Sequence, residues 1–406
     1  MSFSRFIAAR ISFKSKRTFS KLIVRIAIVG IMLGLSVMIL TVAIIKGFKH
    51  EITSKVRGFG GDISVYKYDL NNSFENSPIN IDSAFIKRIK TKKFIDHMMP
   101  FATKPGIIKA NNEIEGVVLK GVDKSYDPAF FKENMVSGKV TDFTDTLKAQ
   151  TQVMISTTTA GRLKLKTGDS FLMYFSGQSL LKRKYTISGI YDVGVEEMNK
   201  TFVVGNLSQI QKLNKWEPNQ IGGYQLQTDD FDALEQYSDA LKDMMPINLK
   251  SYTIVDSYPA IFEWLKLLDA NTEVLLILML MVAVINMISA LLIMILERTT
   301  MIGLLKAMGC TNWRIQQIFL YNAFYLIGLG LLLGNILGLG LGWLQQHTHW
   351  FKLDESSYYM KFVPIEIEWR DIALLNIGTL FISLLVMVLP SMLVSRISPV
   401  KAIKFK

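Results

Sequence analysis

Four long runs without a charged residue divide this chain. They cover residues 26–45, 274–296, 318–344 and 372–394. An α-helix needs about 20 apolar residues to cross the hydrocarbon core of a bilayer, and each run reaches that length. The pattern predicts four transmembrane helices and excludes a purely soluble enzyme. The first run is too long for the apolar part of a signal peptide, and no cleavage site of small residues follows it.

Residues 46–272, between the first two runs, follow a different pattern. Short stretches rich in β-branched and aromatic residues alternate with amphipathic stretches, which is typical of a mixed α/β domain. The expected strands are 62–68, 116–122, 152–156, 170–175, 184–191, 201–204 and 224–227. The expected helices are 83–93, 157–165 and 230–244, and residues 56–62 and 257–268 are expected to form stalks next to the first and second spans.

The distribution of charge orients the four spans. Residues 1–25 hold seven basic residues and no acidic one, whereas residues 46–272 hold 29 Lys and Arg against 27 Asp and Glu. Short cytoplasmic segments collect Lys and Arg, so we expect both termini and the 297–317 connection in the cytoplasm. The basic charge suits an anionic inner leaflet better than a nucleic acid, and we expect no nucleic-acid partner.

These patterns together predict the organisation of the chain. We expect a membrane α-helical fold with four transmembrane helices, both termini cytoplasmic, and a large mixed α/β periplasmic domain inserted between helices 1 and 2. The expected segments are a basic cytoplasmic N-terminal segment (1–21), the first span (22–45), the periplasmic core domain with its stalks (46–272), the second span (273–296), a cytoplasmic helical connection (297–317), the third span (318–344), a periplasmic loop (345–371), the fourth span (372–394) and a cytoplasmic tail (395–406).

Glycine recurs every four residues in two of the spans. Small residues at this interval form one stripe on a helix and let two helix backbones approach closely. The stripes therefore predict helix-packing surfaces, either between spans of one chain or between two subunits. They consist of Gly30 and Gly34 in the first span and of Gly330, Gly334, Gly338 and Gly342 in the third.

Common catalytic motifs are absent from the sequence. It contains no G-x-x-x-x-G-K-[ST] phosphate loop, no G-x-S-x-G nucleophile turn and no H-E-x-x-H metal motif. Cys310 is the single cysteine, and His347 and His349 lack a convincing third ligand. We therefore expect no catalytic residue, no metal and no cofactor bound by the chain itself. Amides within spans usually hydrogen-bond between helices, and the spans contain Asn286, Asn322, Asn335 and Asn376.

The connection between the second and third spans does not have the pattern of a loop. Its apolar residues recur at helical spacing and predict about two turns of amphipathic helix, namely Met301, Leu304, Leu305 and Met308. Gly309 suits the C-terminal end of this helix, and Thr311 or Asn312 suits the start of the next one. Two interpretations stay open, because the helix can lie among lipid headgroups or can dock its apolar face in a groove of a cytoplasmic partner.

The same connection resembles a motif of the FtsX/MacB-type ABC permease superfamily. Residues 297–309, Glu-Arg-Thr-Thr-Met-Ile-Gly-Leu-Leu-Lys-Ala-Met-Gly, are similar to that family's E-[KR]-x₃-I-[GA]-[IL]-L-[KR]-[AT]-[ML]-G, and residues 314–319 continue its pattern. Residues 390–403 look like the family's P-x-x-x-A-x-x-x-x-P-[VL]-x-A-L ending, with Val394 and Ile403 in place of the usual Ala and Leu. Residues 159–169 resemble the L-A-x-x-L-x-[LV]-x-x-G-D stretch of its MacB-like periplasmic core.

Within the superfamily, the chain looks most like the lipoprotein-releasing (Lol) permeases. Residues 34–37 and 46–52 are similar to their G-V-x-x-L and N-G-F-E-x-E-[LI] patterns. The Lol permease that recruits a periplasmic carrier has a long hairpin between two core strands. The corresponding connection in this chain, residues 176–183, is short. Docking of a carrier through such a hairpin is therefore not expected.

The resemblance implies a permease subunit in the inner membrane of a diderm bacterium. A separate cytoplasmic ABC ATPase dimer would bind ATP and Mg²⁺, grip this subunit and a second permease copy or paralogue, and drive release of a lipoprotein from membrane lipid to a periplasmic carrier by mechanotransmission. The implied ATPase-coupling residues are Arg298, Met301, Leu304, Leu305, Lys306 and Met308, with the two basic residues on the rim. The acyl chains would lie in a cavity between the first and second spans lined by Ile39, Val42, Ile45, Val274 and Ile277.

Three other functions stay open at this point. A MacB-type efflux permease for small molecules or peptides shares the fold, although such chains usually have a fused or adjacent ATPase. A cell-division-type mechanotransmitter that regulates cell-wall hydrolases usually has a much smaller external domain. A membrane-anchored periplasmic enzyme would need a nucleophile or a metal cluster, and the sequence shows neither.

Overall fold

The computed structural model describes residues 18–397 except 70–73, 82, 145–148, 178–179, 355–357 and 359. The chain forms two compact units. The helical unit comprises the described residues of Met1–Lys49, Trp264–Lys352 and Phe362–Lys406, and the core domain comprises those of His50–Glu263 and Leu353–Lys361. The basic residues expected on the cytoplasmic side before residue 18, and the tail after residue 397, lie outside the described residues.

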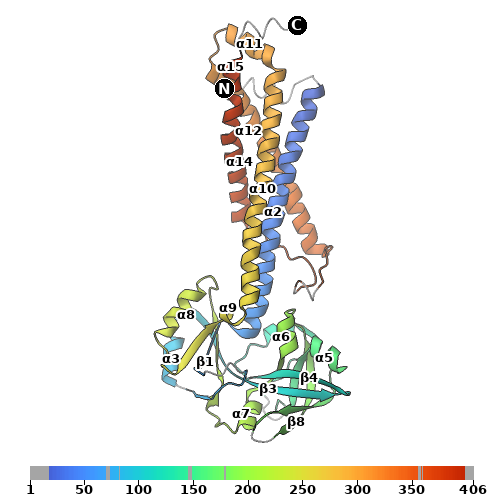
Figure 1. Ribbon diagram of the computed structural model, residues 1–406, viewed down its shortest axis with the longest axis vertical. Helices are drawn as coiled ribbons and strands as arrows, with labels where there is room; N and C mark the ends of the chain where they lie inside the picture. Colours follow the sequence, from blue (N-terminus) through green and yellow to red (C-terminus); the bar gives the residue numbers. More distant parts are fainter. Residues whose placement is uncertain are drawn as a thin grey trace. The chain divides into compact units, whose positions relative to one another are not determined.

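Long helices make up the helical unit (Figure 1). They are α2 (Thr18–Gly60), α10 (Pro259–Glu297), α12 (Asn312–Thr348) and α14 (Trp369–Ser391), with the short helices α11 (Thr299–Ala307) and α15 (Leu393–Arg396). Each of the four long helices is long and apolar enough to cross a membrane. The stalks expected from the sequence are not separate elements, because α2 continues without a break to Gly60 and α10 begins at Pro259.

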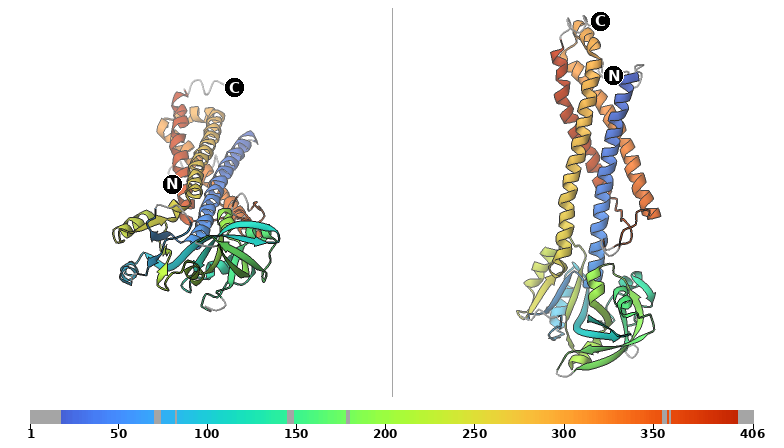
Figure 2. Two further views of the ribbon diagram at one scale, coloured as in Figure 1. Left: turned by 60° about the horizontal axis from the view of Figure 1, so that its bottom comes forward. Right: turned by 45° about the vertical axis from the view of Figure 1, so that its right-hand side comes forward.

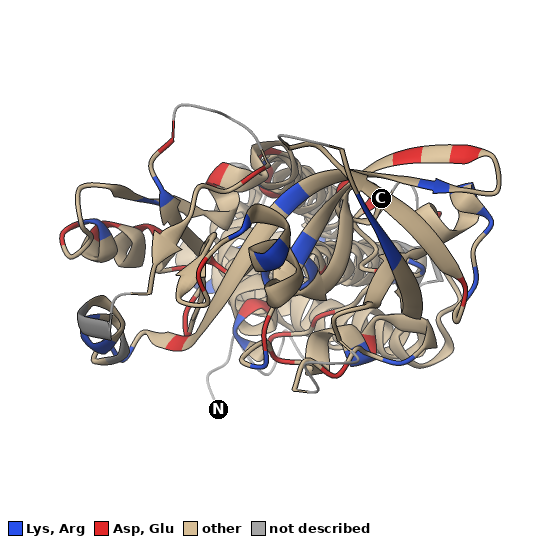
Figure 3. Ribbon diagram, turned by 90° about the horizontal axis from the view of Figure 1, so that it is seen from below, with Lys and Arg blue, Asp and Glu red and all other residues tan. Residues whose placement is uncertain are grey.

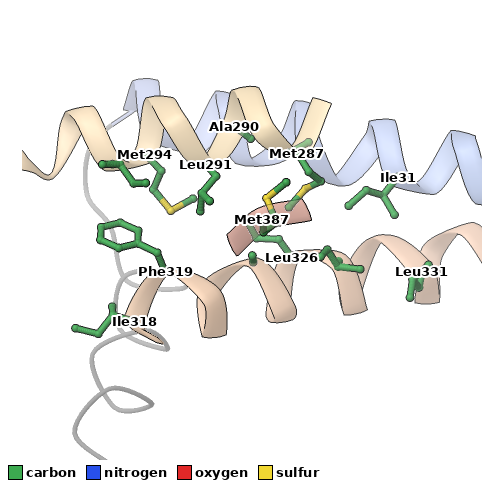
Figure 4. Close-up of a cluster of buried hydrophobic side chains, with 14 of the residues drawn as sticks. Ile31, Met287, Ala290, Leu291, Met294, Ile318, Phe319, Leu326, Leu331 and Met387 are labelled. Carbon is green, nitrogen blue, oxygen red and sulfur yellow. The ribbon is translucent and has the colours of Figure 1, made fainter. Parts of the chain in front are cut away.

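Apolar side chains from α2, α10, α12 and α14 meet in one buried cluster (Figure 4). Leu291 and Met294 of α10 point toward Phe319 of α12, and Ile31 of α2 lies farther along the same cluster. Lipid tails are as apolar as these side chains, so close packing holds helices together in a membrane more than the hydrophobic effect does. Ile31, Leu291 and Phe319 are at most 2% exposed.

Two of the asparagines within the spans pair between α12 and α14. Asn335 donates from Nδ2 to Oδ1 of Asn376 at 2.7 Å, and Asn376 donates back to Oδ1 of Asn335 at 3.0 Å. Each amide also donates to a carbonyl oxygen one turn earlier in its own helix. The expected role of these amides as hydrogen-bonding groups between helices is therefore confirmed for this pair.

The core domain is built on a ten-stranded sheet with the order β12-β1-β11-β3-β4-β9-β6-β8-β5, in which β7 pairs with both β3 and β8 (Figures 1 and 2). The strands are β1 (Ile63–Lys67), β3 (Ile95–Ala110), β4 (Glu113–Val122), β5 (Met135–Gly138), β6 (Gln152–Ser156), β7 (Ser170–Phe175), β8 (Leu181–Tyr191), β9 (Phe202–Asn206), β11 (Gly223–Thr228) and β12 (Leu249–Thr253). A separate pair joins β2 (Ile79–Asn80) to β10 (Gln220–Ile221). The helices are α3 (Ser83–Lys90), α4 (Ala129–Glu133), α5 (Thr157–Leu163), α6 (Glu196–Thr201), α7 (Leu207–Asn214), α8 (Leu234–Lys242) and α9 (Ile254–Ser257).

The seven strands predicted from the sequence are all present, but the long strand β3 was missed. This strand contains two prolines, although proline cannot donate to a ladder and is rare in central strands. The pairing shows how they are accommodated. Pairing with β11 ends at Phe101 and pairing with β7 begins at Gly106, so Pro105 lies in the gap between these partners. Pro100 lies one residue before the pairing with β4 begins.

Charges of both signs are interspersed over the face of the core domain shown in Figure 3. This arrangement agrees with the near balance of 29 basic and 27 acidic residues in 46–272.

Candidate functional site

Helix α11 packs one face against its own chain. Ile302 is fully buried and Leu305 is 7% exposed, and both belong to the cluster that contains Ile315 and Phe319 of α12. Gly309 follows the helix with a φ of +86°, a left-handed conformation that glycine adopts without strain. The expected helix and its stop at Gly309 are therefore present. Thr311 occupies the N-cap of α12, although its side chain makes no capping hydrogen bond.

The predicted apolar face of α11 is divided in the structure. Leu304 is 56% exposed and Met308 is 67% exposed, whereas Met301 is half-buried against the helical cluster. Leu305, which was predicted to dock in a partner together with Leu304 and Met308, is buried in the helical cluster of this chain. Leu304 and Met308 are left as the apolar side chains that a partner can reach.

Lys306 binds the end of the last described helix. Its Nζ donates to the carbonyl oxygens of Val394 at 2.7 Å, Ser395 at 3.2 Å and Ile397 at 2.8 Å. Carbonyl groups at a helix C-terminus have no partner within the helix and carry partial negative charge, so an ammonium group is favourable there. Burial lowers the pKa of Lys306 from its ordinary value. Lys306, which was expected on the rim of a partner's groove, is half-buried and hydrogen-bonded to carbonyl oxygens of its own chain. Arg298 stands at the N-cap of α11.

The glycine stripes pack within the chain. A Cβ atom added at Gly330 would lie 2.8 Å from Cβ of Ile31, and one added at Gly334 would lie 3.0 Å from the carbonyl oxygen of Met32. Gly338 faces Ser36 in the same way. The glycine stripe of α12 therefore packs against α2. The other stripe glycines lie close to side chains of the same chain as well, Gly30 to Asn286, Gly34 to Ala283 and Gly342 to Ile365 and Ile367.

The residues predicted to line an acyl-chain cavity do not come together. Ile39 is 2% exposed and faces Gly338 of α12, so it does not line a cavity between α2 and α10. Val42 lies with Ile39 beside residues 366–372, where the structure leaves only about 10 Å³ of space. Val274 and Ile277 are 57% and 53% exposed on α10. The packing of α2 on α12 thus places Ile39 against Gly338. Ile45 is half-buried.

The outer part of α2 has ion pairs to two other helices of the helical unit. Lys46 pairs with Glu368 at 2.8 Å and with Asp371 at 2.6 Å, both on or next to α14. Lys49 pairs with Asp269 of α10 at 2.7 Å. These side chains are partly exposed, so each pair stabilises the arrangement by less than about 1 kcal/mol.

The C-terminal end of α2 is anchored in the core domain by a buried ion pair. Arg57 donates to both oxygens of Asp62 at 2.5 and 2.8 Å and to the carbonyl oxygen of Thr228 at 3.0 Å. Asp62 is fully buried and also accepts hydrogen bonds from N and Oγ1 of Thr228 at 2.7 and 2.9 Å. Two strands, β1 and β11, are thereby tied to the last turn of this helix.

A buried lysine completes this anchor. Lys120 of β4 is 2% exposed, and its Nζ donates to the carbonyl oxygen of Phe59 and lies 4.3 Å from the centre of the Phe59 ring. Tyr126 donates to the carbonyl oxygen of Gly58 at 2.9 Å. Burial lowers the pKa of Lys120 to about 7. The α2 anchor, defined as residues 57–59 with Asp62, Lys120 and Tyr126, therefore satisfies polar groups at the helix end and bonds its last turn to the sheet. One weak signal of this anchor is visible in the sequence, a lysine inside the apolar strand 116–122.

No three His, Cys, Asp or Glu side chains converge as metal ligands among the described residues. His347 and His349 have other contacts. The Nδ1 atom of His347 lies 2.9 Å from the carbonyl oxygen of Trp343, and the ring of His349 lies 4.0 Å from that of Phe362.

Two known protein families match successive parts of the chain. Residues 26–244 match the family described as MacB-like periplasmic core domain, and residues 273–399 match the FtsX-like permease C-terminal family. The lipoprotein-releasing system transmembrane protein LolE of Haemophilus influenzae is 20% identical, with 96% of each chain covered. LolC of Xylella fastidiosa is 21% identical, with 97% of this chain and 96% of the relative covered. LolC of Neisseria meningitidis is 20% identical over the same shares.

Two solved structures are also similar. The periplasmic region of MacB from Actinobacillus actinomycetemcomitans has a TM-score of 0.35 at 13% identity and covers 51% of this chain and 95% of its own. The extracellular domain of the ABC-type transporter YknZ from Gram-positive bacteria has a TM-score of 0.32 at 14% identity and covers 47% of this chain and 99% of its own.

Proposed function

The chain belongs to the FtsX/MacB-type ABC transporter permease superfamily, and from this premise we propose that it releases lipoproteins from the inner membrane. It is a multi-pass inner-membrane permease subunit with a large periplasmic domain and is not itself catalytic. The observation that carries the proposal is similarity to permeases named as lipoprotein-releasing over 96–97% of this chain. The proposal includes cytoplasmic termini and a core domain inserted between the first two spans.

The work of release would come from a separate cytoplasmic ATPase dimer that binds ATP and Mg²⁺. Leu304 and Met308 offer this partner an apolar surface on α11, while Leu305 and Lys306 hold α11 to α12 and α15. A second permease copy or paralogue would complete the transporter, and a periplasmic carrier would accept the cargo. Release of a lipoprotein from the bilayer requires free energy from ATP hydrolysis. Each buried CH₂ group holds an acyl chain in the bilayer by about 0.8 kcal/mol, so a triacylated protein does not leave unaided.

The exposed apolar face of α10 is the surface offered to acyl chains under this proposal. Val274, Leu278, Met281 and Ile285 recur at helical spacing and are 47–57% exposed. In a bilayer these side chains face lipid or a neighbouring subunit. We propose this surface instead of the five-residue cavity expected from the sequence. Of those five residues, Val274 and Ile277 are exposed on α10.

Mass spectrometry of the protein purified in mild detergent tests the proposal. We expect an ABC ATPase, a second permease and an acyl-linked peptide to copurify. Photocrosslinkers at Val274 and Ile277 should capture lipoprotein, and capture should fall when its acyl chains are removed. A crosslinker at the buried Ile39 is the matched control. Capture that does not depend on the acyl chains contradicts lipoprotein release.

The same experiment separates the other functions of this family. Copurification of an outer-membrane duct protein without acyl-linked peptide would favour a MacB-type efflux permease. Copurification of a regulator of cell-wall hydrolases without cargo would favour a cell-division-type mechanotransmitter.

A further inference from the structure

A channel lined by both polar and apolar side chains crosses one face of the core-domain sheet. It has a volume of about 650 Å³, within the range of ligand sites in proteins. Its floor includes Tyr252 of β12, Ser64 and Tyr66 of β1, Gln225 of β11 and Lys120 of β4. The pairing of the strands puts these residues on one face, since Ser64 lies opposite both Gln225 and Tyr252. Ile63 and Val65 alternate with them and are fully buried on the other face.

A short segment, residues 74–76, also lines the channel and is fixed by specific contacts. Phe74 packs edge-on against Phe202 of β9 with ring centres 6.2 Å apart. Asn76 accepts hydrogen bonds at Oδ1 from N and Oγ1 of Thr103 at 2.8 and 2.7 Å. Glu75 pairs with Lys104 at 2.5 Å. These contacts hold residues 74–76 beside β3, where they line the channel.

The dimensions of the channel suit a single extended chain. Its lining residues come from six strands that are neighbours in the sheet, from β12 to β9. Strands lie about 4.8 Å apart, so the floor is about 24 Å long. An extended peptide advances about 3.3 Å per residue and would fill that length with about seven residues. Spread over this length, the volume leaves room for small side chains only.

The chemistry of the lining favours a peptide over an acyl chain. Gln225 is 6% exposed, and its Oε1 atom has no hydrogen-bond partner among the described residues. A buried amide oxygen without a donor is costly, and an acyl chain would leave it unsatisfied. A peptide backbone offers N–H and C=O groups along its whole length. Hydroxyl groups of Ser64 and Thr201 and the amine of Lys120 line the same space. Phe59, Phe101 and Phe202 supply apolar walls.

We propose that this channel binds an extended peptide segment of about seven residues with small side chains. The peptide would lie against Phe59 and Gly60, the last residues of α2, and next to Ile254 and Ser257 of α9. Its backbone N–H groups would donate to Oε1 of Gln225. Charges of both signs at the channel, Lys67 and Lys250 with Glu197 and Asp256, leave the site without a preference for a strongly charged peptide. The inference stands apart from lipoprotein release, because it requires neither an acyl chain nor an ATPase.

Binding of a defined peptide to the full-length protein in detergent tests the inference. The probe is a fluorescent, non-acylated octapeptide of Ser, Ala and Gly, followed by fluorescence anisotropy. We expect saturable binding, at least tenfold weaker binding to Gln225→Leu, and none to Ser64→Phe, which fills the channel. Gln227→Leu, on the same strand but outside the lining, should bind as the wild type does. Absence of saturable binding, or equal affinity for Gln225→Leu, overturns the inference.

A second measurement needs no variant. A benzophenone form of the same octapeptide, photocrosslinked to the wild-type protein, should attach to β1, β11 or residues 74–76. Attachment elsewhere overturns the inference. Palmitate should not displace the peptide, and complete displacement would identify an acyl-chain channel instead. Failure of lipoprotein copurification, by contrast, would contradict the proposed function and leave these binding results unchanged.

Discussion

Lys306 of α11 donates a hydrogen bond from Nζ to the carbonyl oxygen of Val394, 2.7 Å away, across 88 positions of sequence. Two further carbonyl oxygens, those of Ser395 and Ile397, accept from the same ammonium group. Lys306 therefore joins α11 to the end of the fourth span through hydrogen bonds. The sequence alone indicates only a charged residue on an amphipathic helix. Leu305 of the same helix is buried in the cluster that includes Ile315 and Phe319 of α12, so α11 has contacts with both neighbouring helices.

Replacing Lys306 tests this link. Lys306→Met keeps the aliphatic stem but removes the charged donor, and hydrogen bonds from charged groups contribute about 1.5–3 kcal/mol. We expect faster hydrogen exchange at the amides of residues 393–397, measured by mass spectrometry, with no change in the core domain. Lys306→Arg should restore most of the protection. Lys212→Met, on an exposed helix face, is the control, and identical exchange in Lys306→Met and wild type would contradict the link.

The docking face of α11 is tested at its exposed residues. Met308→Asp and Leu304→Asp place a charge where a partner's apolar groove would bury it, which costs several kcal/mol. We expect at least tenfold lower recovery of the ATPase in a pull-down, with normal membrane insertion. Leu305→Ala should instead lower thermal stability, because Leu305 is buried against α12. Undiminished ATPase recovery and ATP turnover with Met308→Asp would show that the helix lies among lipid headgroups.

The glycine stripe of α12 provides its own controls. At Gly334 an added Cβ would meet Cβ of Leu35 and the carbonyl oxygen of Met32 at 3.0 Å, whereas nothing lies within 4 Å of a Cβ at Gly340. Gly334→Ile should therefore lower stability by about 1–3 kcal/mol through overpacking. Gly340→Ile, which adds the same side chain to the same helix, should not. Thermal unfolding in detergent measures both, and equal midpoints would show that the stripe does not seat α2.

Lys120 predicts a pH dependence of stability. Its folded pKa of about 7 lies below the ordinary value of 10.5, so between these values the unfolded chain binds a proton that the folded chain does not. Stability should therefore rise as pH increases from about 7 to about 9, by up to about 1.4 kcal/mol per unit for this one group. Lys120→Met should flatten the rise in unfolding midpoints, while the exposed Lys124→Met should not. A rise of equal slope in Lys120→Met would contradict the assignment.

Local patterns were sufficient for much of the fold. The first three apolar runs each lie within one long helix, the fourth extends from α14 into α15, and the seven strands predicted from residue type and alternation are all present. Strand β3 was not predicted. Whether Pro100 and Pro105 fit in a strand depends on where the partner strands begin and end, and those strands are distant in sequence. The α2 anchor was not predicted for a related reason. In the sequence Asp62 and Lys120 are ordinary polar residues, and only the folded structure shows that both are buried and bonded to the end of α2.

The sequence by itself determined the elements whose physics is local: four helices long enough for a bilayer, a mixed α/β insertion, and an amphipathic helix that ends at Gly309. Only the tertiary structure decided which side of each helix is free. Periodicity groups Met301, Leu304, Leu305 and Met308 on one face, but α12 covers Leu305 and leaves Leu304 and Met308 exposed. The tertiary structure also decided that Ile39 faces Gly338 and that Lys306 is hydrogen-bonded to Val394. Spacing along a helix fixes the relative direction of side chains, whereas the neighbour each side chain meets depends on how distant segments pack.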